Sequence, residues 1–320
     1  MARMSVKCTF RAALASVIAL VALMGAAQAA DPTRLPVGDG NIAQQPRLGF
    51  VWPCATRFGG GGAQRSGTWL RGDGTFDFTA KPEVDGSVDW ASELSVTPDG
   101  NRRRIVGNGL PNHSTGRYPV ARGDDAYRHD RNPNTISAQR LDVSVPAAPR
   151  AARSPSCLPM GPIGVLLTGA VFFNSLDARG EDAAAHEIQD ACQGHPERSG
   201  QYHYHMLSTC LEPAGKGGGY SPLVGYAFDG FGIFGRRGES GAVLSNADLG
   251  DCHGHSHEIT WDGARTELFH YHATWEFPYT LGCYRGTAEV SETRQGPPPE
   301  GGPPPRGRRP PPGGGPPPPN

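Results

Sequence analysis

The sequence lacks a long apolar run, a surplus of charge of one sign and the familiar nucleotide-binding motifs. Its formal net charge is −1 over 320 residues. Without a strongly basic field we expect no nucleic-acid partner. We find no phosphate-binding loop, dinucleotide fingerprint or serine-nucleophile motif. Glycine and proline make up about a quarter of the chain, and because both residues disrupt helix interiors, a helical bundle is excluded.

The first 29 residues have the three parts of a secretory signal peptide. Arg3, Lys7 and Arg11 form a basic start, residues 12–24 form an apolar run, and residues 27–29 match a small-x-small cleavage site. The run is shorter than the roughly 20 residues of a typical membrane-spanning helix. We therefore predict an exported protein, periplasmic or extracellular, that does not span a membrane after processing.

Two further segments have compositions unlike the rest of the chain. Residues 30–46 are polar and contain Pro and Gly, which is typical of a leader or linker. Residues 289–320 are dominated by Pro and Gly, and such a segment cannot build an apolar core. We predict a disordered tail there, whose candidate partners are an envelope polymer or a proline-binding protein.

Between these segments, short apolar runs alternate with turn residues. Period-two alternation, typical of half-buried strands, occurs at 75–78, 87–90, 94–96 and 141–145. Continuous apolar runs, typical of buried strands, occur at 163–167 and 171–173. We predict one domain over 47–288 that is all-β or β-dominated, an α+β fold with at most a few short helices.

Two local features refine this prediction. Asp229-Gly230 separates two apolar runs and predicts a hairpin closed by a type I′ turn. Residues 181–191 begin with acidic residues and predict one short helix.

The histidines are concentrated and ordered. Eight of the 11 lie between positions 195 and 272. A Cys-x-Gly-His box at 192–195 is followed by Tyr-His-Tyr-His at 202–205, and a second such box at 252–255 is followed by Phe-His-Tyr-His at 269–272. We interpret this recurrence as an internally duplicated unit.

These motifs resemble the YHYH-domain family of exported proteins. The segments Gly-Tyr-Ala-Phe-Asp-Gly-Phe at 225–231 and Tyr-Thr-Leu-Gly-Cys at 279–283 fit the same family, as do 107–113 and 132–134 upstream. The resemblance covers about residues 100–286 and implies no established activity. The chain departs from the family pattern at Phe269, the first aromatic residue of the second box, and at Gly232, where relatives often have Pro.

The His-x-His pairs have the spacing of metal ligands. Alternate side chains of a strand share a face, so His203 and His205 lie on the face opposite to Tyr202 and Tyr204. Two imidazoles at i and i+2 can chelate one cation, and neutral imidazole suits zinc and copper. If the two His-x-His strands pair, their imidazoles converge on one surface.

The predicted metal ligands are His195, His203, His205, His255, His270 and His272. The carboxylates predicted to orient their rings are Asp190, Asp248, Asp251 and Glu258. The alternative is that the histidines hydrogen-bond within the sheet and hold no metal.

Six cysteines follow the signal peptide, an even number that favours disulfides in an exported chain. Cys192–Cys210 and Cys252–Cys283 would each close one repeat, leaving Cys54 with Cys157. The alternative is metal ligation, because Cys192 and His195, like Cys252 and His255, have zinc-like spacing.

Two hypotheses of function follow from these patterns. The first is an exported protein that binds a transition metal through paired His-x-His strands, hydrolytic with zinc or redox-active with copper if it is an enzyme. The second is a non-catalytic module that binds envelope material or another protein and has structural histidines. No catalytic residue can be assigned from the sequence.

The signal peptide gives the first testable prediction. Cleavage after Ala29 should give an exported chain that begins at Ala30. Intact-mass measurement of the exported protein checks this, and a mature chain that still contains Arg3 would contradict it.

Overall fold

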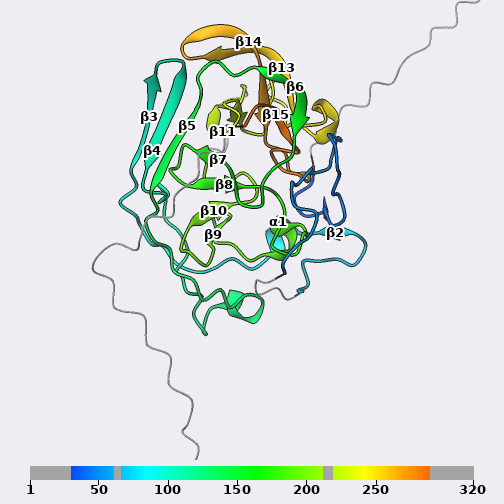
Figure 1. Cartoon of the computed structure of the whole chain (residues 1–320). Helices are drawn as coiled ribbons and strands as arrows, with labels where there is room; N and C mark the ends of the chain where they lie inside the picture. The colour runs from blue at the N-terminus through cyan, green and yellow to red at the C-terminus, as the bar shows by residue number, and fades with distance from the viewer. Residues whose placement is uncertain (1–29, 61–65, 212–218, 289–320) are drawn as a thin grey trace, which may run out of the picture.

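The computed structural model describes residues 30–60, 66–211 and 219–288 (Figure 1). The predicted signal peptide and the predicted Pro/Gly-rich tail lie outside the described residues. None of the helices in the described part of the chain has the length and hydropathy that a membrane span requires. The domain is β-dominated, as predicted.

The centre of the domain is a mixed eight-stranded sheet. Its strands lie side by side in the order β13-β14-β12-β11-β7-β8-β10-β9. In chain order they are β7 (Pro162–Leu166), β8 (Val171–Phe173), β9 (Gly194–Pro196), β10 (Tyr202–Tyr204), β11 (Leu223–Ala227), β12 (Gly232–Phe234), β13 (Gly254–Trp261) and β14 (Ala264–His272).

Smaller sheets and short helices surround this sheet. A three-stranded sheet consists of β3 (Leu94–Asp99), β4 (Arg102–Gly107) and β5 (Leu141–Pro146). Two further sheets have two strands each, β1 (Leu35–Pro36) with β2 (Thr75–Phe76) and β6 (Ala151–Ser156) with β15 (Tyr284–Gly286). The helices are η1 (Phe78–Ala80), η2 (Asp125–Arg128), α1 (Ala183–His186) and η3 (Asn246–Asp248).

The eight-stranded sheet has the same strand order in both directions from its middle pair, β11 and β7. On each side, an antiparallel hairpin (β7–β8 or β11–β12) is followed by a parallel neighbour (β10 or β14) and an antiparallel outer strand (β9 or β13). This order supports the predicted duplication, which stays a prediction.

Two of the four strands predicted from alternation are present in full. Residues 94–96 and 141–145 lie in β3 and β5, and every second residue of β5, from Leu141 on, is buried. Residues 75–78 form only the short β2 and the start of η1. Residues 87–90 form no strand, and Val88 makes a single bridge to Thr115.

The Asp229-Gly230 hairpin exists, but its predicted type I′ turn is wrong. The Gly230 N–H donates to the Ala227 carbonyl at 2.9 Å, and the Ala227 N–H donates to the Phe231 carbonyl at 2.9 Å. Only Gly230 of the dipeptide has positive φ, at 90°. This is a three-residue loop with glycine at the left-handed position. The Asp229 carboxylate is buried, where it accepts hydrogen bonds from the Tyr271 hydroxyl at 2.5 Å and the Gly286 N–H at 2.9 Å.

A type I′ turn occurs instead at Asp262-Gly263, between β13 and β14. Both residues have positive φ, 49° and 82°, as this turn requires. The Asp262 carboxylate pairs with the buried guanidinium of Arg103 on β4 at 2.6 Å. The tip of the long β13–β14 hairpin, at the top of Figure 1, is thereby fixed to the three-stranded sheet.

The predicted helix over 181–191 is much shorter in the structure. Helix α1 spans one turn, begins at the N-cap Asp182 and ends at Glu187, whose backbone is extended. The buried ammonium of Lys81 donates hydrogen bonds to the carbonyls of Ala184 at 2.6 Å and Glu187 at 2.8 Å, and to the side-chain oxygen of Gln189. Because these acceptors are satisfied by a side chain rather than by a further turn, the chain leaves the helix at Glu187.

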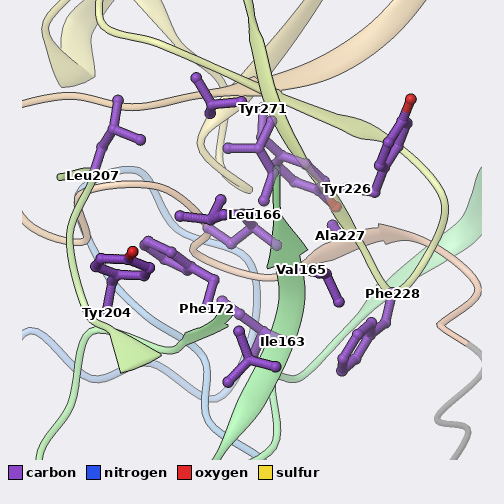
Figure 2. Close-up of a cluster of buried hydrophobic side chains, with 14 of the residues drawn as sticks. Ile163, Val165, Leu166, Phe172, Tyr204, Leu207, Tyr226, Ala227, Phe228 and Tyr271 are labelled. Carbon is purple, nitrogen blue, oxygen red and sulfur yellow. The ribbon is translucent and has the colours of Figure 1, made fainter. Parts of the chain in front are cut away.

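The main core lies along the eight-stranded sheet (Figure 2). Ile163, Val165 and Phe172 come from the first hairpin, and Tyr204 and Tyr271 come from the two histidine-rich strands. All five side chains are almost completely buried. The tyrosines therefore anchor both histidine-rich strands in the core.

Residues 30–46, expected to form a leader or linker, pack on the domain. Leu35 on β1 pairs with Phe76 and has no exposed surface. It lies in a second apolar cluster with Trp69 and Val84. The Gly38 N–H donates to the Asp182 carboxylate at 2.8 Å, which ties this segment to the start of α1.

The structure contains the three disulfides favoured from the sequence, Cys54–Cys157, Cys192–Cys210 and Cys252–Cys283. The alternative in which Cys192 and Cys252 act as metal ligands is therefore not adopted. Three disulfides are typical of a protein in an oxidising compartment outside the cytoplasm.

The disulfides give a stability prediction. The paired variant Cys192→Ser/Cys210→Ser should lower the free energy of unfolding by about 2–5 kcal/mol, because the unfolded chain loses a crosslink. Denaturant unfolding measures this loss. Thiol titration of the mature wild-type chain in denaturant should detect no free cysteine, and finding several would contradict the assignment.

Candidate metal centres

The two His-x-His strands do not pair, so the predicted single histidine surface is wrong. Strands β10 and β14 are separated by β8, β7, β11 and β12 in the central sheet. The histidines gather instead into two groups, each able to hold a metal ion. The first histidine cluster is His195, His203 and His205, and the second histidine cluster is His255, His257, His270 and His272.

The predicted alternation within each strand is confirmed. On β10, Tyr202 and Tyr204 pack in the apolar core, whereas the Nε2 atoms of His203 and His205 lie 3.1 Å apart on the opposite face. The sheet thus uses one face of the strand for packing and the other for the imidazoles.

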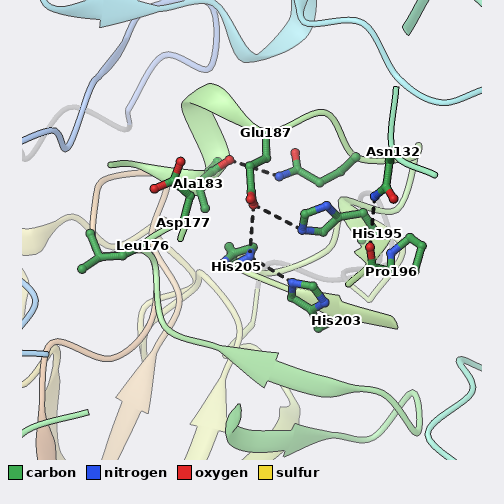
Figure 3. Close-up of polar contacts among 12 residues, drawn as sticks. Asn132, Leu176, Asp177, Ala183, Glu187, His195, Pro196, His203 and His205 are labelled. Carbon is green, nitrogen blue, oxygen red and sulfur yellow. Dashed lines mark hydrogen bonds and ion pairs between the residues drawn. The ribbon is translucent and has the colours of Figure 1, made fainter. Parts of the chain in front are cut away.

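The first histidine cluster is assembled by the β9–β10 hairpin and the end of α1. His195 on β9 is directly opposite His203 on β10. The Glu187 carboxylate reaches the rings from α1, and its Oε2 lies 3.3 Å from His195 Nε2 and 3.2 Å from His205 Nε2 (Figure 3). All three histidines are buried.

Backbone carbonyls fix which ring nitrogen holds the proton. His203 Nδ1–H donates to the Gln201 carbonyl at 3.1 Å, and His205 Nδ1–H donates to the Asn174 carbonyl at 2.6 Å. A carbonyl can only accept, so the proton of each neutral ring is on Nδ1 and Nε2 has a free lone pair. These two lone pairs face each other across 3.1 Å, an arrangement that repels unless a cation lies near both.

The spacing of the ligand atoms fits a metal ion. For metal–ligand bonds of about 2.0–2.1 Å in a tetrahedral site, adjacent ligand atoms lie about 3.3–3.4 Å apart. Three contacts have about this spacing: His203 Nε2 lies 3.1 Å from His205 Nε2, and Glu187 Oε2 lies 3.2 Å from His205 Nε2 and 3.3 Å from His195 Nε2. The ligand atoms that all lie within 4.8 Å of one another are those of the three histidines, without Glu187. Within the described residues, Glu187 Oε2 and His195 Nε2 are buried and have no hydrogen-bond partner.

Electrostatics favour the ligating protonation states of His203, His205 and Glu187, and favour the protonated ring of His195 in the metal-free protein. Burial lowers the pKa of His203 well below its usual value and that of His205 to about 4, so both rings are neutral near pH 7. Burial opposes ionisation of Glu187, but His195 and His205 outweigh it and lower the pKa of Glu187 to about 2. Burial would lower the pKa of His195, but the Glu187 carboxylate outweighs burial and raises it.

The first histidine cluster opens into a pocket of about 480 Å³. Its lining includes all three histidines and Glu187, together with the Phe173 ring, which stacks on His203 at 3.9 Å, and the carboxyl of Asp130. A small molecule in this pocket would lie beside the cluster. The pocket is therefore large enough for a small molecule, and not only water, to reach the first histidine cluster.

The second histidine cluster lies on the β13–β14 hairpin, where His255 is directly opposite His270. The ligand atoms of its four residues all lie within 4.8 Å of one another. The predicted ligand His255 is thus joined to His270 and His272 but is far along the sheet from His203 and His205.

The four carboxylates predicted to orient the rings have other partners or are exposed. Asp190 accepts hydrogen bonds from the Tyr202 hydroxyl and from the Gly116, Cys192 and Gly194 N–H groups. Asp248 caps η3 by accepting from Ser245. Glu258 pairs with Arg265 on the hairpin surface, and Asp251 is exposed. Backbone carbonyls orient His203, His205, His270 and His272 instead.

Three residues in or beside the two histidine clusters were not predicted from the sequence. Glu187 lies inside the predicted helix over 181–191, so nothing in the sequence indicates that it faces the histidines. In the structure α1 ends at His186, and Glu187 follows it next to the cluster. His257 was not among the predicted ligands, although Asp262-Gly263 indicates a hairpin in which His255 and His257 share a face, as His270 and His272 do. Glu239, whose Oε1 lies 2.6 Å from His257 Nδ1, belongs to no motif.

Comparison with known families adds one finding. The family model described as YHYH protein matches residues 142–243. Over this segment the chain is similar to that family, in agreement with the resemblance expected from the motifs. The match is shorter than the 100–286 suggested by the motifs, and it contains Glu187, His195 and the Tyr-His-Tyr-His box at 202–205. It ends before the four histidines of the second cluster. No curated protein and no solved structure matches the chain.

The buried rings of the first histidine cluster give a pH prediction for the metal-free protein. The pKa of His205 is about 4 in the fold against an ordinary value of 6.5. Below pH 6.5 the unfolded chain therefore takes up a proton that the folded chain refuses until about pH 4, so stability falls across that window.

Denaturant unfolding at several pH values, with a chelator present, measures this loss. His205→Gln removes one of several buried rings with a lowered pKa and should make the fall in stability between pH 6.5 and 4 less steep, by up to one proton's worth of slope. Identical slopes for the variant and the wild type would contradict the prediction.

Proposed function

We propose that this exported protein binds a divalent transition metal ion in the first histidine cluster, through His195, His203 and His205 with Glu187. The observation that supports this most directly is the pair of facing Nε2 lone pairs on His203 and His205, with the Glu187 carboxylate 3.2 Å from one of them. Imidazole with one carboxylate suits zinc, and copper is the second candidate.

The side chains of the first histidine cluster fit a divalent metal ion by their own chemistry. Two rings have Nδ1 occupied by carbonyls, so Nε2 is the atom left to ligate. The carboxylate offsets part of the charge of a divalent ion in a buried site, where an uncompensated charge is costly. Near pH 7 the pKa directions favour neutral His203 and His205 and ionised Glu187, whereas His195 has to lose a proton when the metal binds.

The pocket supports a site that acts on small molecules. A zinc ion bound by such ligands lowers the pKa of a bound water to about 7 and polarises carbonyl or phosphoryl oxygens. The chain supplies a stacked aromatic wall at Phe173 and an acidic group at Asp130 beside the cluster. Export is supported by the three disulfides and by the domain family.

Metal content tests the proposal. The variant His205→Ala should contain one zinc ion less per chain than the wild type after both are loaded and dialysed. Glu187→Gln should weaken zinc binding by more than the roughly 10–100-fold that loss of an outer-sphere partner costs. Plasma mass spectrometry gives the stoichiometry, and competition with a chromophoric chelator gives the affinity.

His129→Ala is the control, because His129 packs against Trp69 and belongs to neither cluster. It should leave zinc content and affinity unchanged. Equal zinc content in His205→Ala and wild type, both shown to be folded by circular dichroism, would overturn the proposal.

A further inference from the structure

The second histidine cluster is built from one hairpin. His255 and His257 lie on β13 and His270 and His272 on β14, with ring centroids 4.4 Å apart for His257 and His270 and 5.1 Å apart for His255 and His270. His270 and His272 have no exposed surface. The four rings therefore share one face of a two-stranded ribbon, at the outer edge of the central sheet.

Hydrogen bonds again leave Nε2 as the inward atom. His270 Nδ1–H donates to the Leu268 carbonyl at 3.0 Å, and His272 Nδ1–H donates to the Gly235 carbonyl at 2.7 Å. Their Nε2 atoms face each other at 3.2 Å. The tautomers are fixed in the same way as in the first cluster, so two lone pairs again point at one place.

The other two rings complete the set. The Glu239 carboxylate lies 2.6 Å from His257 Nδ1 and holds that ring from outside, the arrangement by which carboxylates orient metal-binding histidines. The Nε2 atoms of His255 and His257 are buried and have no hydrogen-bond partner among the described residues. One ring nitrogen of each of the four histidines lies within 4.8 Å of those of the other three. The Nε2 atoms of His270 and His272 contact each other, and those of His255 and His257 have no hydrogen-bond partner among the described residues.

We propose that the second histidine cluster is an independent metal site of four imidazoles, which takes Cu²⁺ ahead of Zn²⁺ and excludes Mn²⁺. It differs from the first cluster because no carboxylate is among its ligands. All-nitrogen sites favour copper and zinc over ions that prefer oxygen, and copper binds most tightly among the divalent first-row ions.

Aromatic rings surround the second histidine cluster, and the neighbouring hollow does not reach its four histidines. The Tyr220 ring packs edge-on against His257 and His272 at 5.6 and 5.7 Å, and the Phe234 ring packs against His270 at 4.9 Å. A hollow of about 750 Å³ beside the hairpin is lined by Tyr220, Phe234 and Glu239 but by none of the four histidines. The ion would be held away from molecules in that hollow.

The experiment isolates the second cluster by removing the first. In a Glu187→Gln/His205→Ala background, the chain should bind one Cu²⁺, with an electron paramagnetic resonance spectrum that shows nitrogen superhyperfine splitting. Adding His270→Ala/His272→Ala should abolish that spectrum. The wild type should bind two ions per chain, each pair of variants one, and the combined variant none.

Milder variants separate ligation from folding. His257→Ala removes a ligand near the surface of the hairpin and should lower Cu²⁺ affinity without loss of the thermal transition. Glu239→Gln keeps all four imidazoles and should weaken Cu²⁺ binding roughly 10–100-fold. His129→Ala should change neither, and Mn²⁺ should not displace Cu²⁺ from this site.

The outcomes distinguish the two proposals. Copper that is unaffected by His257→Ala and Glu239→Gln, or no copper in the Glu187→Gln/His205→Ala background, overturns the second site and leaves the first intact. Copper lost only on changing the hairpin histidines, with no ion lost from His205→Ala, supports the second site and overturns the first.

Discussion

Hydrogen bonds from histidine Nδ1 to backbone carbonyls are the constraint on which both clusters depend. An imidazole in water can present either nitrogen, but a ring whose Nδ1–H is held by a carbonyl presents only Nε2. The carbonyls of Gln201, Asn174, Leu268 and Gly235 do this for four rings. The tyrosines between those histidines fill the core, so tight packing on one face of each strand fixes the positions of ligand atoms on the other.

Features that depend on residues close together in the chain could be predicted from the sequence. Alternation of side chains is a property of any extended strand, and it placed His203 with His205 and His270 with His272 correctly. The cysteine pairs followed from their positions around the histidine boxes. The partner of each strand, however, depends on the connections between strands. Because β10 and β14 each lie parallel to the second strand of a preceding hairpin, they end on opposite sides of the sheet.

The two errors of local structure, at the Asp229-Gly230 turn and in the helix over 181–191, share one cause, which is a tertiary contact that overrides a local preference. Asp229 has the sequence of a type I′ turn, but its carboxylate is buried against Tyr271 and Gly286 and the loop gains a residue. The predicted helix over 181–191 ends early because Lys81, far away in the chain, takes its last carbonyls. Glu187 and Glu239 reach the rings only through such contacts, so no spacing in the sequence could reveal them.

The hydrogen bonds from Lys81 to the end of α1 also mean that the two histidine clusters differ in how they form during folding. Lys81 and Glu187 are 106 positions apart, whereas all four rings of the second cluster lie on one hairpin with a two-residue turn. Closing a long loop costs more chain entropy than closing a short one, and local contacts form first. The hairpin cluster can therefore assemble while residues far upstream are still unfolded. The donor atoms of the second histidine cluster would then be in place before Glu187 reaches the first.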